Sequence, residues 1–197
     1  PQWSAENKLT ILVQIGLFKA PDLPNVPLLM DLAKNEEDRA VLKLLSASTT
    51  IGRPIFTTPG VPEDRVRYHV CWGSWPGPHV TDVNLRDIVH LVLKIRAQAF
   101  VIEGANPRHE HEWKVWQDVK LPAGKLLIPG VISHASNIVE HPELVAERIG
   151  RYAGVVGREN VIAGTDCGMG GRIHPQVAWA KLQALAEGAA LATRQLS

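Results

Sequence analysis

The sequence predicts an α/β protein with a parallel sheet whose strands are joined by helical crossovers. From residue 67 onward, short apolar runs of strand length alternate with amphipathic stretches of helix length. This alternation is typical of β-α-β units, in which a helix returns the chain so that successive strands run parallel. The chain also changes character near residue 66. We therefore expect two parts, a segment over 1–66 and a β/α array over 67–197.

The second part contains four apolar runs expected to form strands and four stretches expected to form helices. The clearest helix carries Leu85, Val89 and Val92 at helical spacing, and Asp82 can cap its start. Pro142 and Pro175 mark the first turns of two further helices, where proline is tolerated. The expected strands span 67–72, 99–104, 125–132 and 161–166, and the expected helices span 83–96, 110–116, 142–155 and 177–193.

The first part reads as a small α/β segment interrupted by prolines. An apolar run over 9–16 predicts a buried strand, and the proline-rich stretch 21–27 cannot lie inside a helix. We expect a helical turn over 28–32 and a helix that Asn35 caps and that continues to about residue 46. Extended chain over 52–56 and a turn over 57–62 should follow.

The composition is that of an ordinary globular protein. The 197 residues are 45% hydrophobic and 21% charged, with a formal net charge of +1. This charge gives no reason to expect a nucleic acid or an anionic membrane as partner, and no apolar run approaches the ~20 residues of a membrane span. We expect a cytoplasmic protein, in a compartment where thiols stay reduced.

Four residues of the second part have the side chains and the placement of zinc ligands. His69 and Cys71 are two residues apart in an apolar run, so on a strand both point to one face. Glu103 and Cys167 follow two further runs, and functional groups of parallel α/β arrays collect at the C-terminal ends of strands. Two thiolates, an imidazole and a carboxylate complete a tetrahedral zinc shell. The wide spacing favours a catalytic ion, with Glu103 as the weaker ligand that yields to substrate.

The two cysteines also allow another interpretation. Cys71 and Cys167 are the only cysteines of the chain, and in an oxidising compartment they would form a disulfide. The histidine two residues before Cys71 favours the metal site over this alternative.

Several motifs of the second part carry a family resemblance. They are Tyr68–Gly73, Glu103–Trp113, Pro129–Ile132, Asn137 with His141–Glu143, and Gly157–Gly168. Through them, residues 67–193 resemble the catalytic half of the cobalamin-independent methionine synthases, including the branch of epoxyalkane–coenzyme M transferases. The resemblance implies zinc held by His69, Cys71, Glu103 and Cys167. It implies further that the ion activates a thiol substrate as a zinc thiolate, which attacks an alkyl donor.

The same resemblance implies a barrel of eight β/α units, of which this chain carries about four. The fold class expected is therefore α/β, with parallel β/α units forming about half of a TIM-type barrel behind a small N-terminal α/β segment. The loop after Cys167, residues 168–173, looks shortened because it runs directly into His174-Pro175.

The first part resembles a different family. The stretches Val13–Gly16, Pro21–Pro27, Gly52–Pro54 and Pro59–Val66 make residues 8–66 similar to a slice of the receptor proteins of tripartite tricarboxylate transporters. The binding cleft of that fold needs both of its lobes, so the resemblance assigns no ligand-binding residue to this chain.

Residues 108–112 are rich in histidine and glutamate. We interpret them as a polar loop and helix start beside the site, with a second metal site as the alternative. His109 is expected to orient a substrate or a carboxylate next to the metal, so Glu103 and His109 are the candidate catalytic residues. Asp166 is expected to be a structural hydrogen-bond partner.

The function expected is that of a zinc-dependent thiol alkyl- or methyltransferase-like protein. Its partners would be a small-molecule thiol and an alkyl donor. The alternatives are a non-catalytic fusion fragment with vestigial sites and a zinc hydrolase that activates water. A half-barrel leaves two sheet edges open, so we also expect a homo-oligomer.

Overall fold

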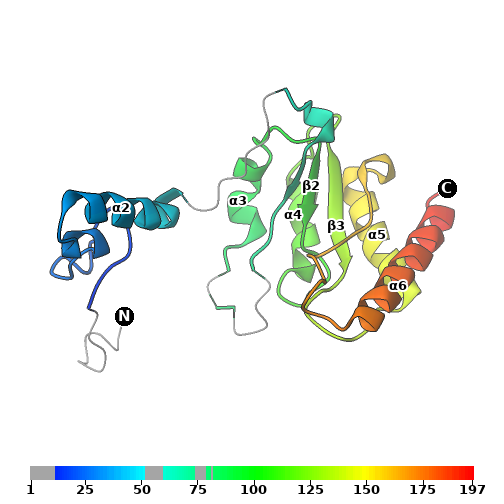
Figure 1. Ribbon diagram of the computed structural model, residues 1–197. Coiled ribbons are helices and arrows are strands. Elements are labelled where there is room, and N and C mark those ends of the chain that lie inside the picture. Colours follow the sequence, from blue (N-terminus) through cyan, green and yellow to red (C-terminus); the bar gives the residue numbers. More distant parts are fainter. Residues whose placement is uncertain (1–11, 52–59, 74–78, 81) are drawn as a thin grey trace. The chain divides into compact units, whose positions relative to one another are not determined.

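The computed structural model describes residues 12–51, 60–73, 79–80 and 82–197 (Figure 1). The chain divides into two compact units, Pro1–Pro59 and Gly60–Ser197. The extended chain expected over 52–56 and most of the turn expected over 57–62 lie outside the described residues.

In the first unit, Gln14 organises the proline-rich loop. Its side-chain amide donates to the carbonyls of Leu23 and Val26 at 2.8 Å each and accepts the backbone N–H of Ala20. The strand expected over 9–16 is wrong for its described residues, 12–16, which form only an isolated bridge between Gln14 and Leu28. Leu12 in this run is 76% exposed, so it has no sheet to cover it.

The helices of the first unit agree with the sequence more closely. A 3-10 turn, η1 (Leu29–Leu32), precedes helix α2 (Glu36–Ile51). Asn35 caps α2 as expected, because its side-chain oxygen accepts the backbone N–H of Asp38 at 2.7 Å. The helix continues past residue 46, where the sequence places its end.

The second unit is built on a four-stranded parallel sheet of order β1-β2-β3-β4. Its strands are β1 (Arg67–His69), β2 (Ala99–Ile102), β3 (Leu126–Ile132) and β4 (Gly164–Thr165). Neighbouring strands are also consecutive in sequence, which is the connectivity of a (β/α) barrel. The expected α/β class with parallel β/α units is confirmed.

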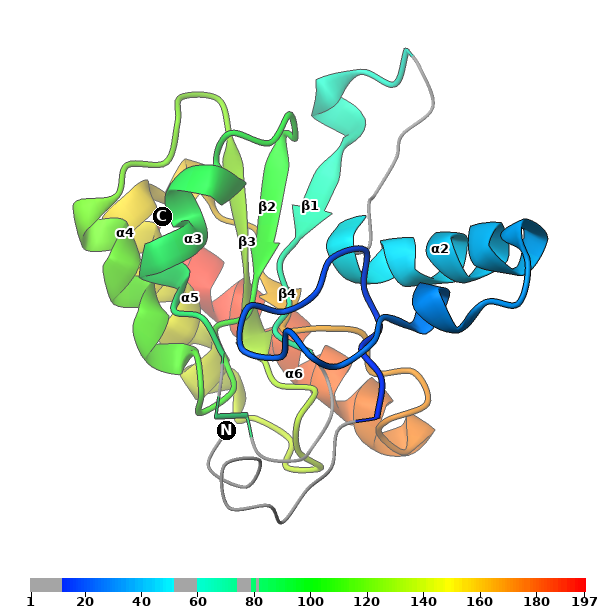
Figure 2. The ribbon, with the colours of Figure 1, turned by 90° about the vertical axis from the view of Figure 1, so that its left-hand side faces the viewer.

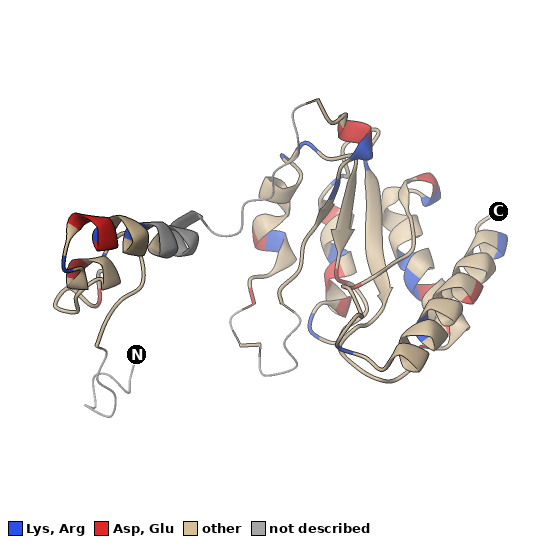
Figure 3. Cartoon of the chain, in the orientation of Figure 1, with Lys and Arg blue, Asp and Glu red and all other residues tan. Residues whose placement is uncertain are grey.

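Before, between and after these strands, the described residues form four α-helices and three 3-10 segments. They are η2 (Glu63–Arg65), α3 (Leu85–Val92), η3 (Glu110–Lys114), α4 (Val115–Asp118), α5 (Pro142–Val156), η4 (Arg158–Asn160) and α6 (Pro175–Gln195). Figure 2 shows α3, α4 and α5 together on one side of the strands. Strands β2 and β3 carry no charged residue, and the charges of this unit lie mainly on helices and loops (Figure 3).

The core fills the space between the sheet and these helices. Phe100 and Leu127, on neighbouring strands, pack with residues of α3, α4 and α5 in one apolar cluster. Val131 of β3 packs with residues of α5 and α6 in a second cluster. Both clusters lie on the helix-covered face of the sheet. On the opposite face, Val101 and Ile128 lie in register with His69.

Two expectations about the first helix of this unit are wrong. Helix α3 spans Leu85–Val92 instead of 83–96, and its N-cap is Asn84 instead of Asp82. The carboxylate of Asp82 is already engaged by His79 Nδ1 at 3.0 Å and by an Arg108 nitrogen at 3.2 Å. Its side chain is therefore drawn toward the loop after β2.

The first and last strands are shorter than their apolar runs. Strand β1 ends at His69, although the N–H of Val70 still donates to the Val101 carbonyl at 2.9 Å. Strand β4 contains two residues, because its register with β3 shifts between Gly130 and Ile132.

Among the described residues, the helices are too short or too polar to cross a membrane.

Candidate metal centre

Residues His69 and Cys71 lie on the open face of the sheet. The side chains around β1 alternate: Tyr68, Val70 and Trp72 pack against the helix-side core, whereas His69 and Cys71 are exposed. The strand-like backbone continues beyond β1 through the Val70–Val101 hydrogen bond, so the two candidate ligands keep the same orientation.

Cys167 reaches the same place from the other edge of the sheet. It follows β4 by two residues, and its Sγ lies 3.7 Å from Sγ of Cys71. The ligand atoms of His69, Cys71 and Cys167 all lie within 4.8 Å of one another. Among the described residues, this is the group of histidine, cysteine and acidic side chains with the spacing of a metal site.

The sulfur pair has the separation of zinc ligands and not of a disulfide. Two sulfurs bound to one tetrahedral zinc at ~2.3 Å lie about 3.8 Å apart, and the observed separation is 3.7 Å. A disulfide needs about 2.05 Å, and none joins the two residues. The residues present therefore fit a zinc ion, which would be held by His69, Cys71 and Cys167.

The fourth expected ligand, Glu103, lies beside this group and is fully buried. Its Oε1 accepts the backbone N–H of Trp72 at 3.3 Å, and its Oε2 accepts the side-chain N–H of Asn106 at 2.7 Å. Arg108 approaches the same oxygen at 3.8 Å. The carboxylate is thus oriented by protein donors next to Cys71, and its role as a ligand stays a prediction.

The Cys71 thiol is protonated at neutral pH when no metal is bound. Partial burial of the sulfur raises the pKa of Cys71 to about 11, with hydrogen bonds to Glu103 and Cys167 adding to the effect. The backbone N–H of Gly73 donates to the sulfur and opposes this shift only partly. A cation at this position would reverse the balance, because it stabilises the thiolate directly.

The buried carboxylate of Asp166 holds the backbone that follows Glu103. Asp166 accepts the backbone N–H groups of Gly104 and Ala105 at 2.7 and 2.9 Å, and its other oxygen accepts from Asn106 at 3.0 Å. These bonds make Asp166 a structural partner, as its sequence position suggests. Gly130 permits the arrangement, because a Cβ there would lie 2.1 Å from Oδ1 of Asp166.

His109, the other candidate catalytic residue, contacts Trp72, which follows the ligand Cys71 in the chain. Its ring stacks on Trp72 with centroids 4.0 Å apart, and its Nδ1 and Nε2 lie 2.9 Å from Glu112 and 3.4 Å from Asp82. Burial opposes a charge on the ring, but Glu112, with Glu103 and Asp82, raises the pKa of His109 above its usual value. The structure does not bring His109 into the ligand group. Its catalytic role stays a prediction.

Two further residues at this end of the sheet were not singled out from the sequence. His134 follows β3 by two residues and is 4% exposed, and its buried Nδ1 has no hydrogen-bond partner among the described residues. Burial lowers the pKa of His134, although the carboxylates of Glu103 and Asp166 act in the opposite direction. Arg172 donates to Sγ of Cys167 at 3.4 Å. The strand-end rule that placed the ligands also applies to His134.

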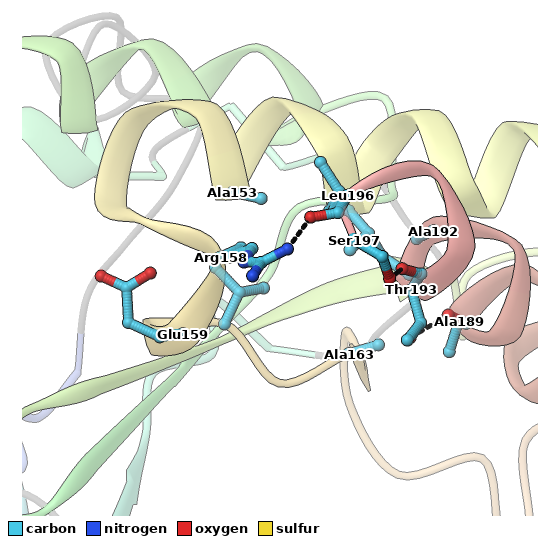
Figure 4. A pocket seen from close by; sticks show the side chains of 11 residues that line it. Ala153, Arg158, Glu159, Ala163, Ala189, Ala192, Thr193, Leu196 and Ser197 are labelled. Atoms are coloured by element: carbon cyan, nitrogen blue, oxygen red, sulfur yellow. Dashed lines mark hydrogen bonds between the residues drawn. The ribbon is translucent and has the colours of Figure 1, made fainter.

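A cavity in the helix layer of the second unit lies away from the metal centre. It has a volume of about 490 Å³ and lies between α5, η4, the chain that leads into β4, and α6, where Arg158 donates to the carbonyl of Leu196 (Figure 4). Small and apolar side chains supply most of its lining, and none of the metal-centre residues is among them. We therefore place the functional site at the strand ends.

The comparisons with known proteins agree with the barrel architecture. The chain is similar to the B12-independent methionine synthase from Shewanella sp. W3-18-1, solved in complex with selenomethionine, with a TM-score of 0.58 and 23% identity. The match covers 70% of this chain and 41% of that protein. At this identity the similarity shows the fold, part of a TIM-type barrel, and confirms that expectation.

No family model and no curated protein matches the chain. The resemblance of residues 8–66 to tricarboxylate transporter receptors finds no support in these comparisons and stays a prediction.

Proposed function

We propose that this protein is a zinc-dependent thiol alkyl- or methyltransferase-like protein. The observation that carries the proposal is the meeting of His69, Cys71 and Cys167 within 4.8 Å, at the C-terminal ends of strands in a barrel-type sheet. The similarity of this sheet to a B12-independent methionine synthase supports the choice of thiol chemistry over hydrolysis. The partners proposed are a small-molecule thiol and an alkyl donor.

The residues around the ion have separable roles in this proposal. When bound, zinc supplies a Lewis acid that lowers the pKa of a thiol substrate. His69, Cys71 and Cys167 would hold the ion, and Glu103 would be the weaker fourth ligand. Asn106 and the Trp72 backbone would orient the Glu103 carboxylate, because both donate to it.

Metal analysis of the full chain, purified under reducing conditions, tests the proposal. We expect about one zinc per chain, lost in Cys167→Ser and weakened at least tenfold in His69→Gln. His111→Gln is the matched control, since His111 is exposed and outside the ligand group. Reduced wild-type protein that binds no zinc would exclude both enzyme interpretations.

Glu103→Ala tests the fourth ligand separately. We expect weaker zinc binding by about ten- to a hundredfold. Unchanged affinity would remove Glu103 from the shell while leaving the three-residue group in place.

The partial match favours a second candidate, a fragment that binds metal without turnover, because this chain spans 41% of the similar protein. Adding a small thiol to zinc-loaded protein separates the candidates. A transferase-like site releases one proton per zinc as the thiol ionises, whereas a vestigial site with a filled shell releases none.

A further inference from the structure

Lys181, in the middle of α6, is a completely buried lysine with a 0% exposed side chain. Its ammonium group lies 2.8 Å from Oε2 of Glu140 and also donates to the carbonyl of Ile138. A buried ammonium is costly unless it is paired and hydrogen-bonded. An apolar contact would avoid this cost, so the ion pair points to a role other than packing.

Glu140 also binds the backbone at the end of β3. Its second oxygen, Oε1, accepts the backbone N–H of Ser133 at 2.7 Å. One carboxylate thus joins α6 to the first residue after the strand. We call Lys181, Glu140 and the Ser133 N–H the loop anchor.

The loop between β3 and α5 depends on this anchor. Its middle residues point to solvent: Ile138 is 76% exposed and Val139 is 41% exposed. Its two ends, Ser133 and Glu140, are buried and bonded to each other. The ammonium of Lys181 then ties both the Glu140 side chain and the Ile138 backbone to α6.

His134 is the residue whose position the anchor controls most directly. It follows Ser133 in the chain and is buried near Glu103 and Asp166, whose charges act on its ring. Nδ1 of His134 has no hydrogen-bond partner among the described residues, so no hydrogen bond fixes this atom of the ring. The backbone at Ser133 is therefore one restraint on where the ring lies, together with the packing that buries His134.

We propose that Lys181 is a positioning residue, which acts through Glu140 to keep His134 at the C-terminal end of β3 beside the metal centre. Two side chains, Lys181 and Glu140, thus link helix α6 to the residue that follows β3. The consequence of this link for thiol binding rests on the proposed function, whereas the placement of His134 does not.

The placement is tested by NMR on the metal-free full chain. The ring nitrogens of His134 are assigned from the signals lost in His134→Gln. In Lys181→Met we expect these signals to shift and broaden. Val89→Ala, a core truncation in α3 at a 2% exposed residue, is the matched control that lowers stability without touching the loop. Identical His134 signals in the wild type and Lys181→Met would overturn the proposal.

A double variant separates positioning from stability. Lys181→Met leaves Glu140 as an unpaired buried charge, and adding Glu140→Gln removes that charge. We expect the double variant to regain melting temperature while the His134 signals stay shifted, because no side chain ties the loop to α6. A purely structural role predicts that both recover together, and that result would contradict the proposal.

Binding of 2-mercaptoethanol to the zinc-loaded protein tests the functional consequence. We expect Lys181→Met to weaken thiol affinity about tenfold while zinc affinity changes less than twofold, because the ligands lie in β1 and in the segments that directly follow β1 and β4. Shifted His134 signals with unchanged thiol affinity would make Lys181 structural only. Failure of the wild type to bind zinc would instead count against the proposed function.

Discussion

At the scale of single residues, Trp72 links the ligand Cys71 to Glu103 and His109. Its backbone N–H donates to Glu103, its ring stacks on His109, and its indole N–H donates to the Val83 carbonyl at 2.5 Å. Because Trp72 directly follows Cys71, these three attachments also hold the backbone at that ligand. His109 can therefore influence the site without contacting the metal.

The protonation of Cys71 makes zinc binding dependent on pH. With a pKa of about 11, the thiol is protonated at neutral pH and must release its proton to solvent when the ion binds. The apparent zinc affinity should rise with pH, by about tenfold per unit for each proton released. Chelator competition between pH 6.5 and 8.5 measures this slope, and an affinity independent of pH would contradict thiolate ligation.

The ligand group was predictable from local sequence, but its surroundings were not. Two-residue spacing placed His69 and Cys71 on one face, and strand polarity brought Cys167 to the same end of the sheet. His134 also follows a strand end, but the sequence around it does not show which residues hold it there. Its importance depends on Glu140 and Lys181, and Lys181 is far from it in the sequence and is brought close only by the packing of α6.

At the scale of elements, the contact between α5 and α6 depends on a glycine. A Cβ on Gly188 would lie 2.4 Å from Cβ of Val145 and 2.7 Å from the Pro142 carbonyl, so the two helices pack closely at this point. The pairing matters for the site, because α6 also carries Lys181.

We expect Gly188→Ala to destabilise the protein by about 1–3 kcal/mol despite the better helix propensity of alanine. Gly154→Ala in α5 is the matched control, since a Cβ there meets nothing within 4 Å and alanine should stabilise the helix by about 0.5–1 kcal/mol. Urea unfolding of both variants gives the comparison. Equal effects of the two substitutions would show that the helices do not meet at Gly188.

The order and direction of the elements followed from the sequence, whereas several of their ends did not. Alternating apolar periodicity identified all four strands and their parallel arrangement. The start of α3 depends on a contact between distant residues, the bond of Arg108 to Asp82, and the brevity of β4 depends on its register with β3. Such contacts leave no local pattern.

At the scale of the whole molecule, the second unit has a sheet with two edges. Strands β1 and β4 each pair with one neighbour among the described strands. Two copies related by a twofold axis parallel to the strands would place β4 beside the β1 of the partner and continue the parallel sheet. The homo-oligomer expected from the sequence remains our proposal on this ground.

Light scattering should therefore give about twice the chain mass of 21.6 kDa. Ile162→Lys, at a 40% exposed residue next to β4, should favour the monomer by placing a charge at the edge. Leu91→Lys, at a 54% exposed residue of α3, should leave the mass unchanged. A monomer at all concentrations would rule out this pairing.

The short distance between Cys71 and Cys167 has a mechanical consequence. The two sulfurs belong to segments that follow the first and last strands, 96 residues apart in sequence, yet they lie 3.7 Å apart. An ion held between them would form a closed loop of chain that includes β2 and β3. A force that pulls the outer strands apart would then act on two metal–sulfur bonds in series. The ion would therefore resist separation of β1 from β4.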